Sequence, residues 1–190
     1  MKIYFTGSLH NLDIDKDVYL QIVKTVESFG YSVKADHILK TTKEELDKKT
    51  APERTSFYKE LNRFITASDV VVAEVSFPST INIGHEVSLA LDKGKPIIAL
   101  YQPGREPGVL QGIHSDRFIL LEYTLTDLKT VLEYGLEEAA AQIDIRFNFF
   151  VSPEIASYLD YVAKKRKLPR AVYLRRLIEE DMAKNSDYSG

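Results

Sequence analysis

A carboxylate follows a glycine and a valine-rich stretch in the segment DVVVAEVSFPSTINIGHE, residues 69–86. The valine run predicts a strand buried on both faces, Pro78 and Ser79 predict the turn that ends it, and Gly84 to Glu86 open a helix. A carboxylate at this edge of a sheet could attack an electrophilic carbon or stabilise a cationic sugar. It could equally do no more than complement the positive end of a helix, a contribution of at most about 1 kcal/mol. The residues alone leave both interpretations open.

A second segment of this kind is FTGSLHN, residues 5–11, which follows an apolar stretch at the start of the chain. Gly7 permits close approach of the backbone to a ligand, and Ser8 offers a hydroxyl group, so the turn could hold a phosphate or a sugar oxygen. An ordinary tight turn between a strand and a helix is the other interpretation.

The elements that must position these residues alternate between strand and helix as far as about residue 142. This alternation predicts an α/β domain over residues 1–142, with a doubly wound parallel sheet of the Rossmann-like, flavodoxin-like kind. Ligands of such sheets bind beyond the carboxyl ends of the strands, where both segments fall. The expected strands are residues 2–8, 31–35, 69–75, 96–101 and 117–123, and the expected helices are residues 17–30, 52–68, 83–91 and 126–142.

Composition excludes several classes of function. The chain has 190 residues, no cysteine and four histidines without ligand-like spacing, so we expect neither disulfides nor a metal site, and we predict no cofactor. No apolar run approaches the roughly 20 residues that cross a bilayer, and the N-terminus lacks the apolar region of a signal peptide. We therefore expect a cytoplasmic protein without a membrane partner.

The stretches IYFTGS, YKELNRFITASDVVVAEVSFPS, IGHE and KPIIALY resemble the nucleoside 2-deoxyribosyltransferase superfamily, most closely its 2'-deoxynucleoside 5'-phosphate N-hydrolase branch. The resemblance covers about residues 1–125 and implies a nucleoside or nucleoside monophosphate as the ligand. It implies that Glu86 attacks C1' of the sugar and that Tyr4 orients the glutamate. Gly7, Ser8 and Ser79 then fall where this family contacts its ligand.

The chain also departs from the family pattern. The acidic residue that serves the leaving base falls on Leu61, and Glu60, a candidate stand-in, lies about 100° further round the expected helix. The loop that leads to Gly84 and Glu86 is one residue longer than usual and lacks its first glycine. His10 replaces an arginine, His85 a tyrosine, and Gln111 a serine that reaches a neighbouring subunit's phosphate. These departures predict weakened phosphate recognition and impaired catalysis.

The tail, residues 143–185, has a different character, with nine Lys and Arg against seven Asp and Glu from Ile143 to the end of the chain. Alternating apolar residues predict a strand, and two apolar stripes predict short helices. FVSPEI and RAVYLRRLIEEDM resemble the ribbon-helix-helix family, which implies a homodimer, or a higher oligomer, that binds double-stranded DNA. The implied base contacts are Arg146, Asn148 and Phe150, and the implied phosphate contacts include Lys167 and Arg170.

A departure in the tail keeps a second interpretation open, because Pro169 stands where the ribbon-helix-helix family favours a serine or threonine. Proline brings neither a hydroxyl nor an N–H group to a phosphate, so the tail could also be a dimerisation module alone. Residues 186–190 are expected to be a disordered end.

Two hypotheses for the whole chain follow. The first is a nucleoside- or nucleotide-binding protein that acts as a ligand-sensing DNA-binding regulator with impaired or absent catalysis. The alternative is an active 2'-deoxynucleoside or 2'-deoxynucleoside 5'-monophosphate N-glycosidase, or a deoxyribosyltransferase, that forms a glycosyl intermediate on Glu86 with Tyr4 and Glu60 as its partners. An oligomeric scaffold with neither activity is the third interpretation.

Overall fold

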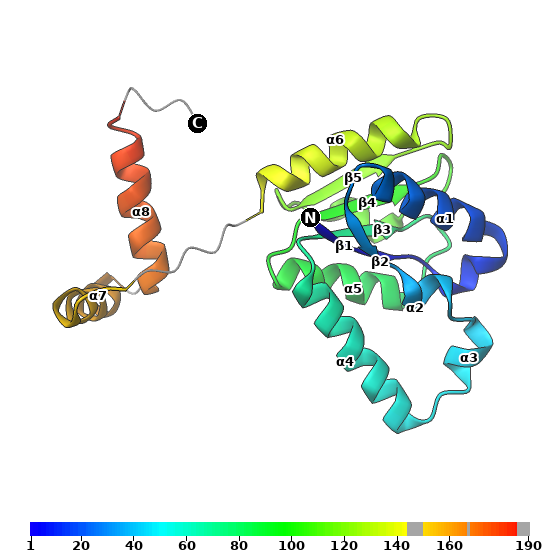
Figure 1. Cartoon of the computed structure of the whole chain (residues 1–190), viewed down its shortest axis with the longest axis horizontal. Helices are drawn as coiled ribbons and strands as arrows, with labels where there is room; N and C mark the ends of the chain where they lie inside the picture. The colour runs from blue at the N-terminus through cyan, green and yellow to red at the C-terminus, as the bar shows by residue number, and fades with distance from the viewer. Residues whose placement is uncertain (144–149, 167, 186–190) are drawn as a thin grey trace. The chain divides into compact units, whose positions relative to one another are not determined.

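The computed structural model describes residues 1–143, 150–166 and 168–185 of the chain (Figure 1). The chain divides into two compact units, Met1–Asp144 and Ile145–Gly190.

The first unit is built on a sheet of five parallel strands in the order β2-β1-β3-β4-β5 (Figure 1). This confirms the predicted parallel α/β architecture. The direction in which successive strands are added reverses at the boundary between β1 and β3, and this is the point where open α/β sheets bind ligands. The strands are β1 (Lys2–Thr6), β2 (Ser32–Lys34), β3 (Val70–Glu74), β4 (Ile97–Tyr101) and β5 (Phe118–Glu122).

Helices cover both faces of the sheet, and two apolar clusters hold them there. Helices α1 (Leu12–Ser28) and α6 (Leu128–Ala141) pack on one face, and α4 (Ala51–Ala67) and α5 (Ile81–Asp92) pack on the other. The connections also contain four short helical segments, which are η1 (Leu9–Asn11), α2 (Asp36–Leu39), α3 (Lys43–Asp47) and η2 (Gly108–Gly112).

The alternation of side chains along β1 decides which face of the sheet carries the tyrosine. Ile3 and Phe5 belong to the cluster under α1 and α6, whereas Tyr4 belongs to the opposite cluster, under α4 and α5. Since neighbouring strand residues point to opposite faces, a tyrosine at this position has to face α5.

Helix α4 begins with a capping box, in which the backbone N–H of Thr50 donates to Glu53 Oε2 at 2.7 Å and the Thr50 side chain accepts from the third residue of the helix. Ile65, near the end of the helix, is its buried residue. The first turns of α4 therefore extend beyond the sheet, next to α3, and supply an outer wall for the site described below (Figure 1).

The second unit contains two helices, α7 (Pro153–Arg166) and α8 (Arg170–Met182). Their shared core is small and consists of Leu159, Val162 and Tyr173 with Leu174 packed against them. Both helices lie where the apolar stripes predicted them. The strand expected before them falls on residues 144–149, outside the described residues. Several large apolar side chains remain exposed on this unit, including Ile155, Tyr158, Tyr161, Leu177, Ile178 and Met182.

Candidate active site

A buried tyrosine and a buried glutamate form the centre of the site. The hydroxyl of Tyr4 donates a hydrogen bond to Glu86 Oε2 at 2.8 Å. Glu86 shares the inward face of α5 with Ile83 and Ala90, which lie three and four residues away, and it is only 6% exposed. This carboxylate is therefore not a surface group that merely complements a helix end.

Burial sets the protonation of this pair. Loss of hydration raises the pKa of Glu86, while the hydrogen bond from Tyr4 and the charge of His85 act in the opposite direction. Burial and the neighbouring Glu86 raise the pKa of Tyr4 far above its usual range. Tyr4 thus stays protonated at every physiological pH and remains the donor of the hydrogen bond.

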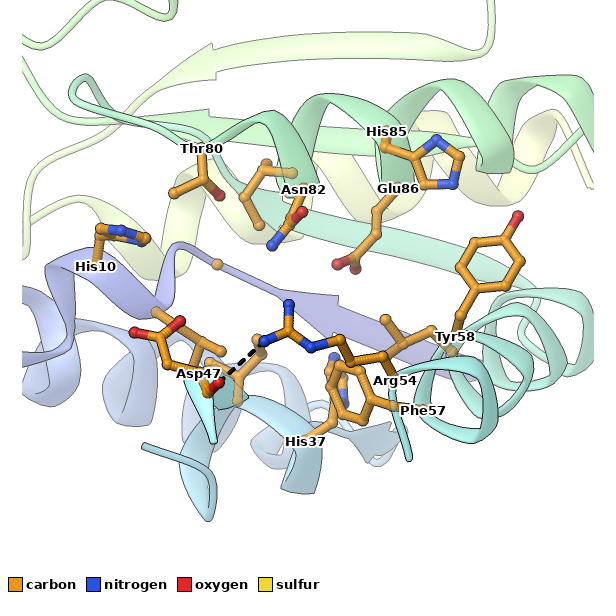
Figure 2. A pocket seen from close by; sticks show the side chains of 15 residues that line it. His10, His37, Asp47, Arg54, Phe57, Tyr58, Thr80, Asn82, His85 and Glu86 are labelled. Atoms are coloured by element: carbon orange, nitrogen blue, oxygen red, sulfur yellow. Dashed lines mark hydrogen bonds between the residues drawn. The ribbon is translucent and has the colours of Figure 1, made fainter. Parts of the chain in front are cut away.

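The glutamate opens onto a cavity of about 310 Å³ (Figure 2). Its walls come from the turn after β1, from α2 and α3, from the first half of α4 and from the first turns of α5. The cavity therefore lies at the reversal point of the sheet. The lining residues are Gly7, Leu9, His10, His37, Ile38, Asp47, Arg54, Phe57, Tyr58, Leu61, Thr80, Asn82, Ile83, His85 and Glu86.

A histidine in α2 lines the cavity beside this pair. The ring of His37 stacks on the ring of Tyr4, with centroids 4.7 Å apart and planes 8° from parallel. Burial, helped by the charge of Lys34, lowers the pKa of His37 to about 4, so its imidazole is neutral at physiological pH. Among the described residues neither ring nitrogen has a hydrogen-bond partner. A neutral imidazole offers one donor and one acceptor, which suits the polar edge of a ligand.

Curated proteins with similar sequences are nucleotide N-hydrolases. A 5-hydroxymethyl-dUMP N-hydrolase of Tetraodon nigroviridis is 30% identical over 141 residues, which are 70% of this chain and 95% of that protein. A putative 2'-deoxynucleoside 5'-phosphate N-hydrolase 1 of Syntrophotalea carbinolica is 33% identical over 140 residues, which are 73% and 96% of the two chains. This chain belongs to the 2'-deoxynucleoside 5'-phosphate N-hydrolase family. A further member, the protein of the same name from Nematostella vectensis, is 32% identical over 139 residues, 69% of this chain and 90% of its own length.

No protein-family model matches the chain. Among solved structures, the CMP N-glycosidase BcmB of Clostridium botulinum covers 71% of this chain and 98% of its own, at 16% identity and a TM-score of 0.48. A superposition this loose carries no argument, so membership of the N-hydrolase family rests on the sequence relatives.

The structure brings some of the predicted ligand-contacting residues to the cavity of this N-hydrolase family member. Gly7, His10 and His85 line it together with Glu86. Gly7 also brings the turn close to α1, because a Cβ atom at this position would lie 2.8 Å from Tyr19 Cζ.

Four predicted ligand-contacting residues are absent from the cavity wall, and these are Ser8, Ser79, Gly84 and Gln111. Ser8 is buried behind the turn after β1, whereas Ser79 and Gln111 are exposed elsewhere. The loop before α5 contributes Thr80 and Asn82 in place of Ser79. The side chains of this loop that line the cavity therefore lie one and three residues beyond Ser79.

The expected stand-in for the acidic residue does not reach the cavity. Glu60 lies on the exposed side of α4, and its Oε1 is 3.6 Å from Nη2 of Arg63. Leu61, where the N-hydrolase pattern has an acid, lines the cavity. An apolar side chain therefore faces the cavity at this position.

The predicted DNA contacts fall in the second unit. Phe150 is fully exposed, and Arg170 forms an ion pair with Asp160 of α7. Arg146, Asn148 and Lys167 lie outside the described residues.

Two expected absences can be examined for part of the chain. Within residues 1–143, 150–166 and 168–185, no group of three or more acidic, histidine or cysteine side chains could hold a metal ion. No helix in the same ranges is long and apolar enough to cross a membrane.

Proposed function

We propose that this chain hydrolyses the N-glycosidic bond of 2'-deoxynucleoside 5'-monophosphates. The observation that carries the proposal is the hydrogen bond between Tyr4 and the buried Glu86 at the wall of a cavity of nucleoside size. The relatives named for this reaction support it, and they favour the enzyme over the regulator that the sequence first suggested.

In this mechanism Glu86 is the nucleophile. One carboxylate oxygen bonds to C1' of the deoxyribose as the bond from C1' to the base nitrogen breaks, and the base leaves with the electron pair of that bond. Tyr4 holds Oε2 of the same carboxylate and keeps the glutamate in one rotamer. Water then attacks C1' of the glycosyl intermediate, which releases the 5-phosphorylated sugar and returns the carboxylate.

The leaving base has to gain a proton, and neither residue considered for this step supplies it. Leu61 has none to give, and Glu60 points elsewhere. General acid assistance typically accelerates a reaction about 10² to 10⁴-fold. We therefore expect slow turnover and a preference for bases that leave as stabilised anions, since these need the proton least.

The test follows the release of free base by chromatography, with each deoxynucleoside 5'-monophosphate as substrate. Wild-type protein should release base, and Glu86→Gln, which keeps the shape of the side chain, should release none. Glu60→Gln is the matched control, since it removes a carboxylate from α4 outside the cavity, and it should retain wild-type activity. Release that persists in Glu86→Gln would refute the assigned nucleophile.

For the second unit we propose self-association through the exposed apolar side chains of α7 and α8. A core of four side chains buries little apolar surface, and units of this size usually need a partner to be stable. Ribbon-helix-helix pairing and DNA binding remain our proposal for the form of this association, supported by the sequence resemblance.

Light scattering tests the association. The intact chain should run as a dimer or a larger oligomer, and Ile178→Glu, at a position that is 61% exposed, should shift it to the monomer. Duplex DNA at low salt should bind the oligomer in a mobility-shift assay. A monomeric wild-type chain would overturn the association, and an oligomer that leaves DNA unbound would reduce this unit to a dimerisation module.

A further inference from the structure

One of the described side chains that line the cavity is a permanent cation. Among the 15 lining residues Arg54 is the only lysine or arginine, and its neighbours include the carboxyl groups of Asp47 and Glu86. The three lining histidines carry a full charge only when protonated, and His37 is neutral at physiological pH. Any anion that enters the cavity would therefore find its lasting positive charge at Arg54.

Neutral groups hold this arginine in place. Its Nε donates to the carbonyl oxygen of Lys49 at 2.9 Å, and its Nη2 donates to the carbonyl oxygen of Asp47 at 2.9 Å. Within the described ranges no carboxylate forms an ion pair with Arg54. The guanidinium is thus oriented without being neutralised, and three of its five N–H groups remain for a ligand.

The direction of the side chain fits this role. Figure 2 shows the guanidinium reaching from α4 into the cavity on the side of Asn82, with the dashed bond to the backbone of Asp47. The carboxylate of Asp47 points away from the guanidinium in the same view. Arg54 and Glu86 thus meet the cavity from opposite walls, one from α4 and the other from α5.

We propose that Arg54 binds the 5'-phosphate of the substrate and makes the chain selective for deoxynucleoside monophosphates over deoxynucleosides. This proposal rests on the N-hydrolase function above. A phosphate monoester carries a charge between about −1.5 and −2 at neutral pH, and the planar guanidinium fork matches its oxygens. The turn after β1 contributes His10 to the same cavity and no lysine or arginine, so the permanent charge for the phosphate comes from α4.

The experiment compares one deoxynucleoside 5'-monophosphate with the same deoxynucleoside as substrates. In Arg54→Met, kcat/KM for the monophosphate should fall at least about tenfold, while kcat/KM for the deoxynucleoside changes less than about threefold. Inorganic phosphate should inhibit the wild type competitively and should inhibit Arg54→Met much less. Arg54→Lys, which keeps the charge but not the fork, should lie between the two.

Arg63→Met is the matched control, because Arg63 lies on the same helix, pairs with Glu60 and does not line the cavity. This substitution makes the same change of charge, and it should leave the ratio of kcat/KM for the monophosphate to kcat/KM for the deoxynucleoside unchanged. Equal losses for both substrates in Arg54→Met would overturn the proposal, since they would assign Arg54 to the base or to the fold. An unchanged ratio would overturn it too.

Failure of the parent function can be told apart from failure of this inference. If the wild type releases no base, the N-hydrolase function has failed, and calorimetry with the monophosphate and the deoxynucleoside then tests Arg54 through binding alone. A monophosphate that binds the wild type at least about tenfold more tightly than Arg54→Met supports the anion site. Equal affinities, or no binding of the monophosphate to the wild type, overturn it.

Discussion

Replacing Tyr4 by phenylalanine should shift the pH dependence of the reaction. The substitution removes one hydroxyl group, whose hydrogen bond to Glu86 Oε2 is 2.8 Å long and buried. Hydrogen bonds to charged groups contribute about 1.5 to 3 kcal/mol, and each pKa unit corresponds to about 1.4 kcal/mol. Since this bond lowers the pKa of Glu86, we expect that pKa to rise in the variant.

The sign of the effect on activity follows from the role of Glu86. The nucleophile is the carboxylate, so activity is lost when the pH falls through its pKa, and a higher pKa moves that loss to higher pH. At pH values below both pKa values, Tyr4→Phe should be about 10 to 100-fold slower than the wild type, and the difference should shrink as the pH rises. The profile of kcat/KM against pH measures this shift in the free enzyme.

Tyr19→Phe is the matched control, because Tyr19 is equally buried and its hydroxyl donates to the carbonyl oxygen of Ser8 instead of to Glu86. This variant should lose about 1 kcal/mol of stability and keep the wild-type pH profile. An acid limb that stays in place in Tyr4→Phe would refute the reasoning. So would an equal shift in both variants, because it would point to a general loosening of the fold.

Three further outcomes are expected. Gly7→Ala should lower the free energy of unfolding by about 1 to 3 kcal/mol, because the new methyl group would meet the buried ring of Tyr19; an unchanged urea midpoint would contradict this. Arg105→Met should cost about 3 kcal/mol in the same assay, because it removes the positive charge that pairs with the buried carboxylate of Asp15 through two hydrogen bonds of 2.9 and 2.8 Å. A loss below about 1 kcal/mol would show the ion pair to be dispensable. Asp47→Asn should tighten binding of the monophosphate by at most about fivefold, measured by calorimetry, and high salt should abolish the gain; weaker binding would show that the carboxylate helps the ligand.

The sheet of the first unit was predictable because its strands carry strong local signals. Val70–Glu74 begins with four apolar residues and is buried along its whole length, as is typical of a strand in the middle of a parallel sheet. The expected helix at residues 83–91 proved two residues longer at its start and one longer at its end, as α5. Helix ends depend on capping contacts, which periodicity does not encode.

Helices α2 and α3 were not predicted. Each has five residues or fewer, too short for a periodic pattern to emerge, and their stability comes from packing and turns rather than from helix propensity. The prediction therefore left residues 36–51 without structure, although this stretch supplies His37 and Asp47 to the cavity.

The sequence predicted the two residues at the centre of the candidate site, but it did not predict the residues that surround them on the cavity wall. Glu86 and Tyr4 were found because motifs mark them, and the structure brings them together at hydrogen-bond distance. His37 and Arg54 have no sequence signal of their own, since a single histidine or arginine in a polar stretch is ordinary. Only the fold, which brings α2, α4 and α5 together around one cavity, shows that these two residues share the cavity with Glu86.

The position of Glu86 on the inward face of α5 also has a consequence for stability. The fold raises the pKa of this carboxyl group, so the native state binds a proton more tightly than the unfolded chain does, and stability is lost as the pH rises from the unfolded pKa through the folded one. A leucine or methionine packed beside Ile83 and Val87 would carry no such penalty. At neutral pH the buried carboxylate therefore lowers the free energy of unfolding, and this cost is explained if the ionised group is needed for the reaction. A Glu86→Leu variant that is more stable than the wild type but inactive would demonstrate this trade-off between stability and activity.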